Sequence, residues 1–295
     1  MSGSTSSPSG EACDTQQNPN LYIPQTAEII FIREEVKGAR AVKTFRFRFT
    51  DEMIQRSFTY RPGQCALLSV FGKGEAMIAI TSTPLIKDYL EFTVMKQGRV
   101  TTALHEMQVG DTIGIRGPFG NGFPMEDWIG KNIVFIGGGT GQPPIRSVMN
   151  TCLRRRREFG KLTMIYGART SADLVFKEEI QELLKGKEIE VRLSVDVAEK
   201  GWPHFVGFVP TNVMEVKPDP KNTIAVTCGP PIMIKFVVMN LEKLGFTDEQ
   251  IFTTLEGKMK CGLGKCGRCN VGKIYICKDG PVFSWKALKA LPQEY

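Results

Sequence analysis

The chain has 295 residues, enough for two ordinary domains and a small module, and 42% of them are hydrophobic. Its apolar runs are short, so we expect no membrane span. The net charge of +7 favours acidic partners or phosphate-bearing cofactors. We expect no nucleic-acid binding, because the basic run Arg154–Arg157 has no interleaved aromatic residues. We interpret this run as a solvated helix face or, alternatively, as a docking patch for a partner subunit.

Residues 1–20 are rich in Ser, Gly, Asn, Gln and Pro and have no apolar core of a signal peptide. Such a composition predicts a disordered tail rather than a targeting signal. The expected location is therefore the cytoplasm.

Residues 21–125 have a β pattern. In Ala41–Thr50 the side chains of Phe45, Phe47 and Phe49 alternate with arginines, which is typical of a strand with one buried face. The strands are expected at Ala27–Glu34, Ala41–Thr50, Gln64–Phe71, Ala76–Ser82, Leu90–Lys96 and Thr112–Arg116. One short helix is expected near Thr102–Met107. Six short strands at this spacing predict an antiparallel Greek-key β-barrel.

Residues 126–254 alternate between strand and helix patterns. Strands are expected at Asn132–Ile136, Leu162–Tyr166, Glu188–Val195, Thr223–Thr227 and Phe252–Leu255. Helices are expected from Gly141 to Phe159, at Leu174–Leu184 and at Pro231–Leu244. This alternation predicts a parallel α/β sheet that binds its ligand at the carboxyl ends of the strands.

Three strand ends in this half carry residues suited to a dinucleotide. Gly137–Gly141 joins a strand to a helix, where glycines allow a diphosphate to approach the helix N-terminus. The match to G-x-G-x-x-G is imperfect, so a plain turn is the alternative. Arg169 suits a phosphate or ribose, or else a surface ion pair. Cys228 suits a nicotinamide ring, or else simple packing.

The barrel half has two features suited to a flavin. Ile80-Thr81-Ser82 ends a strand with two hydroxyls. Gly98 to Thr102 places a glycine, a cation and two threonines at a helix start, which suits a diphosphate. An N-capped turn is the simpler interpretation of the second segment.

The C-terminal residues 255–295 contain four closely spaced cysteines: Cys261, Cys266, Cys269 and Cys277. The opening C-x4-C-x2-C is the spacing of plant-type [2Fe–2S] centres. Glycines between the ligands allow backbone N–H groups to point at the cluster sulfurs. A zinc site is the main alternative, although zinc more often uses two C-x2-C pairs. A disulfide framework is disfavoured, because the remaining cysteines are scattered.

The chain resembles the ferredoxin–NADP reductase superfamily in the order of its motifs. These motifs are Arg61-Pro62-Gly63-Gln64, Gly117-Pro118-Phe119-Gly120, the glycine loop and Cys228-Gly229-Pro230. The terminal cysteines make the chain similar to the flavin and iron–sulfur subunits of dihydroorotate dehydrogenase B, anaerobic sulfite reductase and sulfhydrogenase. It is also similar to the small subunit of NADH-dependent ferredoxin–NADP oxidoreductase.

The resemblance implies a set of cofactor contacts. FAD is expected to contact Ile80, Thr81, Ser82, Gly98, Arg99, Val100, Thr101 and Thr102. NAD(P) is expected to contact Gly138, Gly139, Thr140, Gly141, Arg169, Cys228, Gly229 and Pro230. The family's Arg-x-Tyr-Ser flavin motif would fall at about Ile78-Ala79-Ile80-Thr81, where only the hydroxyl of Thr81 remains, so FMN stays an alternative to FAD.

The predicted function is electron transfer between NAD(P)H and partner iron–sulfur and catalytic subunits of a larger redox complex, of which a hydrogenase is one type. No side chain is expected to act as a general acid or base, and the only histidines, His105 and His204, have no obvious nucleophile beside them. A cofactor-depleted scaffold subunit and a stand-alone flavin reductase are the alternatives. The sequence leaves open NAD against NADP, the terminal substrate, the direction of flow and electron bifurcation.

Overall fold

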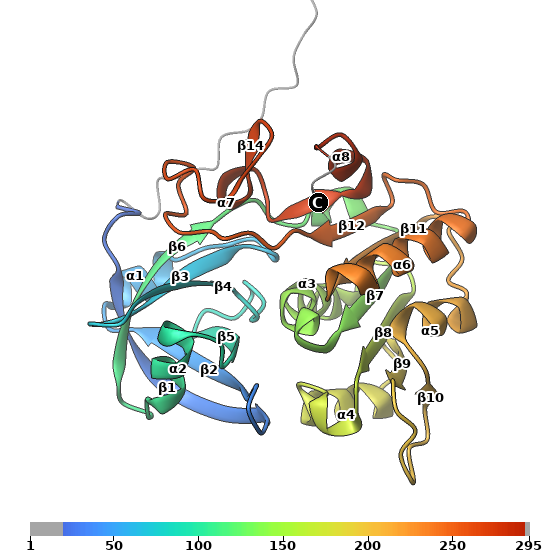
Figure 1. Cartoon of the computed structure of the whole chain (residues 1–295), viewed down its shortest axis with the longest axis horizontal. Helices are drawn as coiled ribbons and strands as arrows, with labels where there is room; N and C mark the ends of the chain where they lie inside the picture. The colour runs from blue at the N-terminus through green and yellow to red at the C-terminus, as the bar shows by residue number, and fades with distance from the viewer. Residues whose placement is uncertain (1–19, 293–295) are drawn as a thin grey trace, which may run out of the picture.

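The computed structural model describes residues 20–292 and consists of a β-barrel, an α/β domain and a C-terminal segment that crosses both (Figure 1). The tail expected at 1–20 therefore lies, except for residue 20, outside the described residues. Within the described range, no helix is both long and apolar enough to span a bilayer.

The barrel is built from one antiparallel sheet with the strand order β4-β3-β6-β1-β2-β5. Its strands are β1 (Gln25–Val36), β2 (Val42–Phe49), β3 (Cys65–Val70), β4 (Gly74–Ala79), β5 (Leu90–Met95) and β6 (Thr112–Phe119). Phe45, Phe47 and Phe49 of β2 point into its core, as their alternation with arginines predicts.

Two helices accompany the barrel: α1 (Glu52–Ser57) and α2 (Arg99–Glu106). Helix α2 was expected, although it begins three residues earlier than predicted. The prediction missed α1, whose start is fixed by the Asp51 side chain accepting hydrogen bonds from the backbone N–H groups of Met53 and Ile54.

The α/β domain has a seven-stranded sheet in the order β10-β9-β8-β7-β11-β12-β15. Its strands are β7 (Asn132–Gly138), β8 (Leu162–Ala168), β9 (Glu190–Val195), β10 (Phe205–Val206), β11 (Thr223–Cys228), β12 (Ile251–Thr254) and β15 (Val282–Ser284). Its helices are α3 (Gln142–Arg154), α4 (Lys177–Lys185), α5 (Val209–Val216) and α6 (Pro231–Lys243), with 3₁₀ turns η2 (Met125–Trp128), η3 (Gly139–Gly141), η4 (Arg156–Glu158) and η5 (Ser171–Asp173). The predicted fold class is confirmed; β10, α5 and β15 are additions to it.

The C-terminal segment has a small hydrophobic cluster of its own and also contacts both domains. It contains β13 (Asn270–Val271), β14 (Ile274–Tyr275), α7 (Ile276–Asp279), β15 and α8 (Trp285–Lys289). Strand β15 pairs antiparallel with β12 and so extends the parallel sheet. The red segment in Figure 1 accordingly lies over the barrel at α7 and over the sheet at α8.

Arg146 on α3 joins the two domains. Its buried guanidinium donates to the Glu91 carboxylate of β5, to the Thr81 carbonyl at 3.2 Å and to Glu179 of α4 at 2.7 Å. It also lies 4.5 Å from the ring centre of Phe176. Burial lowers the pKa of Arg146, but the two carboxylates outweigh this effect and raise it, so the side chain stays charged.

Further hydrogen bonds between the two domains surround this ion pair. The Ser147 hydroxyl donates to the Ser82 carbonyl at 2.6 Å, and the hydroxyls of Thr83 and Thr151 lie 2.8 Å apart. On the other side, the backbone N–H of Phe176 donates to a buried Glu35 carboxylate of β1 at 2.8 Å. These contacts fix the carboxyl edge of the parallel sheet against the barrel.

We expect Arg146→Met to lower the free energy of unfolding by about 1.5–3 kcal/mol, because the buried Glu91 would lose one of its two charged partners and keep only Arg46, whose Nε lies 2.8 Å from it. Urea unfolding measures this change. The control is Arg56→Met, which removes an exposed pair with Glu52 and should cost less than about 1 kcal/mol. Equal effects of the two substitutions would contradict the role given to Arg146.

Candidate functional site

A cavity of about 870 Å³ opens between the carboxyl edge of the parallel sheet and the barrel. Gly138, Gly139 and Thr140 of the glycine loop line it, together with Arg169 and Pro230. The barrel wall is made by Val36, Arg40, Val42 and Met95. The structure thus brings together five of the residues expected at the nucleotide, at the sheet edge where such ligands bind.

Close packing leaves no room for a side chain at two positions of the glycine loop. A Cβ on Gly141 would lie 2.2 Å from the Cys228 carbonyl oxygen, and one on Gly138 would lie 2.2 Å from the sulfur of Met233. Gly139 differs, since its φ is +53° and no atom lies within 4 Å of the position of an added Cβ. Gly139 therefore presents open backbone to the cavity, while Gly141 supports the loop from behind.

Arg169 shares the cavity with two acidic residues that the sequence reasoning missed, Asp173 and Asp196. Burial raises the pKa of Asp196, and the nearby Arg169 partly opposes that rise. Asp196 could have been found from its position directly after β9 at the carboxyl edge. Arg192, by contrast, is exposed and pairs with Glu190 at 2.5 Å.

Cys228 and Gly229 are not among the residues that line the cavity, whereas Pro230 is. The Cys228 thiol is buried, and the Thr254 hydroxyl donates to its sulfur at 2.9 Å. Burial raises its pKa to about 12, so the sulfur remains a neutral thiol at pH 7. A nicotinamide contact by Cys228 stays a prediction.

Gly141→Ala should abolish tight nucleotide binding and lower the melting temperature, because its Cβ would collide with backbone rather than with a flexible side chain. Gly139→Ala is the matched control, since it adds the same methyl group into open space. It should cost only about 1 kcal/mol, for the positive φ. Thermal unfolding of both variants tests this difference, and equal melting temperatures would contradict it; NADH titration is applied to Gly141→Ala alone, because Gly139 itself faces the cavity.

The flavin segment lies at the junction of barrel and α/β domain. Ile80, Thr81 and Ser82 are buried. The Thr81 hydroxyl donates to the Glu91 carbonyl at 2.9 Å, and the Ser82 hydroxyl lies 2.8 Å from the Tyr60 hydroxyl. Both hydroxyls therefore already have partners within the protein. Flavin contacts from this segment stay a prediction, and they would come from its backbone groups and from neighbouring residues.

The start of α2 is suited to an anion. Gly98 has φ +86° and open space beside it, and no side chain caps the helix N-terminus. Arg99 is exposed and donates to the Gly72 carbonyl at 3.2 Å. The Thr101 hydroxyl turns back to the Gln97 carbonyl at 2.7 Å, while Val100 and Thr102 are half-buried. These observations fit a diphosphate held by helix N–H groups.

The four cysteines are grouped in pairs. The Cys261 thiol contacts Cys266, and the Cys277 thiol contacts Cys269. Gly264 donates its N–H to the Cys277 sulfur at 3.2 Å. Among residues 20–292 no three His, Cys, Asp or Glu side chains form a group that would hold one metal ion.

The surroundings of Cys261 favour a thiolate. Partial burial raises its pKa, but backbone N–H groups of Leu263, Cys266 and Lys265 outweigh this and lower the pKa to about 6. Gly262, Gly264 and Gly267 all have positive φ, which lets successive N–H groups turn towards the sulfurs. The donor set thus fits an iron–sulfur cluster.

His105 and the basic run Arg154–Arg157 both make contacts within the chain. His105 is buried, with its Nε2 2.8 Å from the Val94 carbonyl oxygen, so it has a structural role. In the basic run, Arg155 pairs with Glu126 and Glu158, and Arg156 binds the Glu188 carbonyl at 3.0 Å. Much of this run is therefore used within the chain rather than presented as a docking patch.

Comparison with protein families gives matches to three consecutive parts of the chain. An oxidoreductase FAD-binding domain matches residues 32–123, and an oxidoreductase NAD-binding domain matches 135–239. The iron–sulfur cluster binding domain of dihydroorotate dehydrogenase B matches 256–289. The chain is also 41% identical to sulfhydrogenase 1 subunit gamma of Pyrococcus furiosus, over 85% of this chain and 88% of that one.

The chain belongs to this family of flavin and iron–sulfur oxidoreductase subunits. A second relative, the probable dihydroorotate dehydrogenase B (NAD(+)) electron transfer subunit of Methanocaldococcus jannaschii, is 32% identical over 88% of this chain and 91% of the relative. The solved structure of the NADH-dependent reduced ferredoxin–NADP oxidoreductase covers 88% of each chain with a TM-score of 0.72 and 24% identity, which shows the shared fold. The predicted family, enzyme class and FAD, NAD and iron–sulfur domains are thereby confirmed.

Proposed function

We propose that this subunit moves electrons between NAD(P)H and a partner subunit, through FAD on the barrel and a [2Fe–2S] cluster on Cys261, Cys266, Cys269 and Cys277. One observation supports this order above all. The barrel contacts both the nucleotide cavity, through Val36, Val42 and Met95 among others, and the cysteine segment, through Arg116. We also propose NAD(P) contacts at the glycine loop and Arg169.

The chemistry requires such an arrangement. Nicotinamide exchanges a hydride, which carries two electrons, whereas an iron–sulfur cluster accepts one. A flavin supplies both kinds of transfer when bound, and the protein contributes position and electrostatics. Accordingly, the side chains around the cavity bind and orient the nucleotide, and the buried Cys228 thiol is too weakly acidic to serve as a proton donor at neutral pH.

The grouping of the cysteines supports the [2Fe–2S] type. A cluster of this type has two irons, and each takes two cysteine ligands. Cys261 has Cys266 as a neighbour and Cys277 has Cys269, which is compatible with that division, and Cys261 also lies close enough to Cys277 to raise its pKa. Zinc would instead require four sulfurs around a single point. Thiolate ligands of this kind persist in a reducing compartment, which supports a cytoplasmic location.

Electrons are proposed to leave at the exposed side of the cysteine segment. Cys266 is exposed, and so are nearby cations on the same segment: Lys258, Lys260, Lys265, Arg268, Lys273 and Lys278. A partner with an acidic surface around its own redox centre would be attracted to this face. By similarity to the sulfhydrogenase gamma subunit, we propose iron–sulfur and catalytic subunits of a hydrogenase-type complex as partners.

The deciding experiment is an anaerobic absorbance and EPR titration of the purified chain with NADH and then NADPH. We expect flavin bleaching, a one-electron cluster signal and about two irons per chain. Protein without flavin or iron would favour a scaffold subunit instead. Isolated-chain turnover as fast as that of the assembled complex would favour a stand-alone reductase.

Cys266→Ser should remove the cluster signal and the labile sulfide while NADH still reduces the flavin, because the flavin lies upstream of the cluster. Cys152→Ser is the control, because Cys152 lies on α3 in the hydrophobic core of the α/β domain and does not belong to the cysteine segment. Iron and sulfide analysis with stopped-flow flavin absorbance measures both. Loss of flavin reduction in Cys266→Ser alone would contradict the proposed order of transfer.

Two charged residues in the cavity should set the choice of nucleotide. A carboxylate suits the ribose 2′-hydroxyl of NAD, and an arginine suits the 2′-phosphate of NADP. We expect Asp196→Asn to shift the NADH-to-NADPH affinity ratio about tenfold towards NADPH, and Arg169→Gln to shift it towards NADH, in line with 1.4 kcal/mol for a factor of ten. Arg192→Gln is the control outside the cavity, and fluorescence titration gives the three ratios. Unchanged ratios in both cavity variants would remove these residues from the site.

A further inference from the structure

Arg116 of the barrel binds both the cysteine segment and β4, the strand that precedes the flavin segment Ile80–Ser82. Arg116 on β6 is largely buried, and its Nη1 donates to the carbonyl oxygen of Cys261 at 3.1 Å. The same atom donates to the Leu21 carbonyl at 3.2 Å. Cys261 is the first of the four proposed cluster ligands, so a fixed positive charge lies beside the ligand set.

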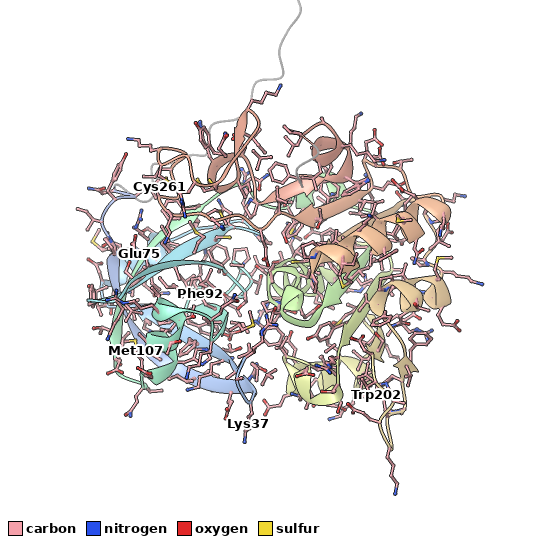
Figure 2. The ribbon with its side chains drawn as sticks, in the orientation of Figure 1. Lys37, Glu75, Phe92, Met107, Trp202 and Cys261 are labelled. Atoms are coloured by element: carbon pink, nitrogen blue, oxygen red, sulfur yellow. The ribbon has the colours of Figure 1, made fainter. Side chains whose placement is uncertain are left out.

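The rest of the guanidinium binds Glu75 on β4 through two parallel hydrogen bonds. Nε lies 2.8 Å from one carboxylate oxygen and Nη2 lies 2.7 Å from the other. The Ser69 hydroxyl also donates to this carboxylate at 2.7 Å. The two-point geometry holds the arginine plane in one orientation, which a lysine cannot reproduce. Figure 2 shows Glu75 and Cys261 on the same side of the barrel.

Packing reinforces the contact between barrel and cluster loop. Arg116 lies 5.6 Å from the ring centre of Phe119. A Cβ on Gly262, the residue after Cys261, would come within 2.7 Å of that ring. The loop that carries the first ligand is therefore held by a charged hydrogen bond and by an aromatic ring, both from the end of β6.

We propose that the Arg116–Glu75 pair sets the reduction potential of the iron–sulfur cluster while it holds the Cys261 loop against the flavin side of the barrel. This inference rests on the proposed function. Four thiolate ligands give the cluster a net negative charge, and reduction by one electron increases that negative charge. A nearby cation stabilises the reduced form, and a nearby carboxylate opposes that effect. Removing Arg116 and removing the Glu75 charge should therefore move the potential in opposite directions.

The experiment is an EPR-monitored redox titration of the anaerobically purified chain with its cluster, supported by iron and sulfide analysis. In Arg116→Gln the potential should shift negative by about 59 mV, a tenfold change for one electron. In Glu75→Gln it should shift positive by a smaller amount, because Glu75 reaches the ligand loop only through Arg116. Arg116→Lys keeps the charge and should stay near the wild-type potential. Arg56→Gln, on exposed α1, is the matched control and should not shift.

A merely structural role predicts other results. Unchanged potentials in Arg116→Gln and Glu75→Gln at full iron content would overturn the proposal, and so would shifts of both in the same direction. If Arg116→Gln fails to assemble the cluster, the test compares the reduction potentials of Glu75→Gln and Arg116→Lys instead. Of these two variants, only Glu75→Gln should then show a shifted potential. A wild-type chain without a cluster would instead refute the proposed function.

Discussion

The buried ion pair between Arg146 and Glu91 is the constraint on which the arrangement of this protein depends. It connects the first helix of the α/β domain to barrel strand β5, and its guanidinium also binds the Thr81 carbonyl within the flavin segment. Because separating the domains would remove this buried, charged hydrogen bond from both partners, the two domains are held in one relative position. The cavity at the carboxyl edge of the sheet exists only because the barrel closes its other side.

The C-terminal segment provides a second connection. Asn121, just after β6, accepts from the Val282 N–H at 3.0 Å and donates to the Val282 carbonyl at 2.7 Å, while β15 itself extends the parallel sheet. The segment is thus attached to both domains rather than tethered by a linker. For one-electron transfer this matters, since the rate depends on a fixed and short separation between the redox groups.

The local electrostatics differ between the cavity and the cysteine segment. At the nucleotide cavity, Arg169 and Asp196 place opposite charges beside each other, which suits a ligand with both phosphates and hydroxyls. At the cysteine segment, backbone N–H groups and the nearby Arg116 favour negative charge on the Cys261 sulfur, whereas burial raises the pKa of the Cys277 thiol to about 12. This difference in local charge is consistent with hydride exchange at one end and single-electron storage at the other.

Local pattern was sufficient for most of the fold, and the order of the motifs, through the family resemblance, indicated the cofactors. The alternation in β2, the glycine loop after β7 and the spacing of the cysteines each follow from chain geometry over a few residues, so they are readable without tertiary contacts. The same reasoning missed β15, because a three-residue strand has too short a pattern, and it missed α1, whose start depends on the single cap of Asp51.

The sequence by itself determined which chemical groups this protein carries and in which order. Only the tertiary structure decided which side chains meet. Arg116 contacts Cys261 across 145 positions, and Arg146 contacts Glu91 across 55. It also showed that the hydroxyls of Thr81 and Ser82 are taken up by protein partners. The physical reason is that short-range periodicity fixes backbone form, whereas charge pairing and burial depend on contacts between segments far apart in the chain.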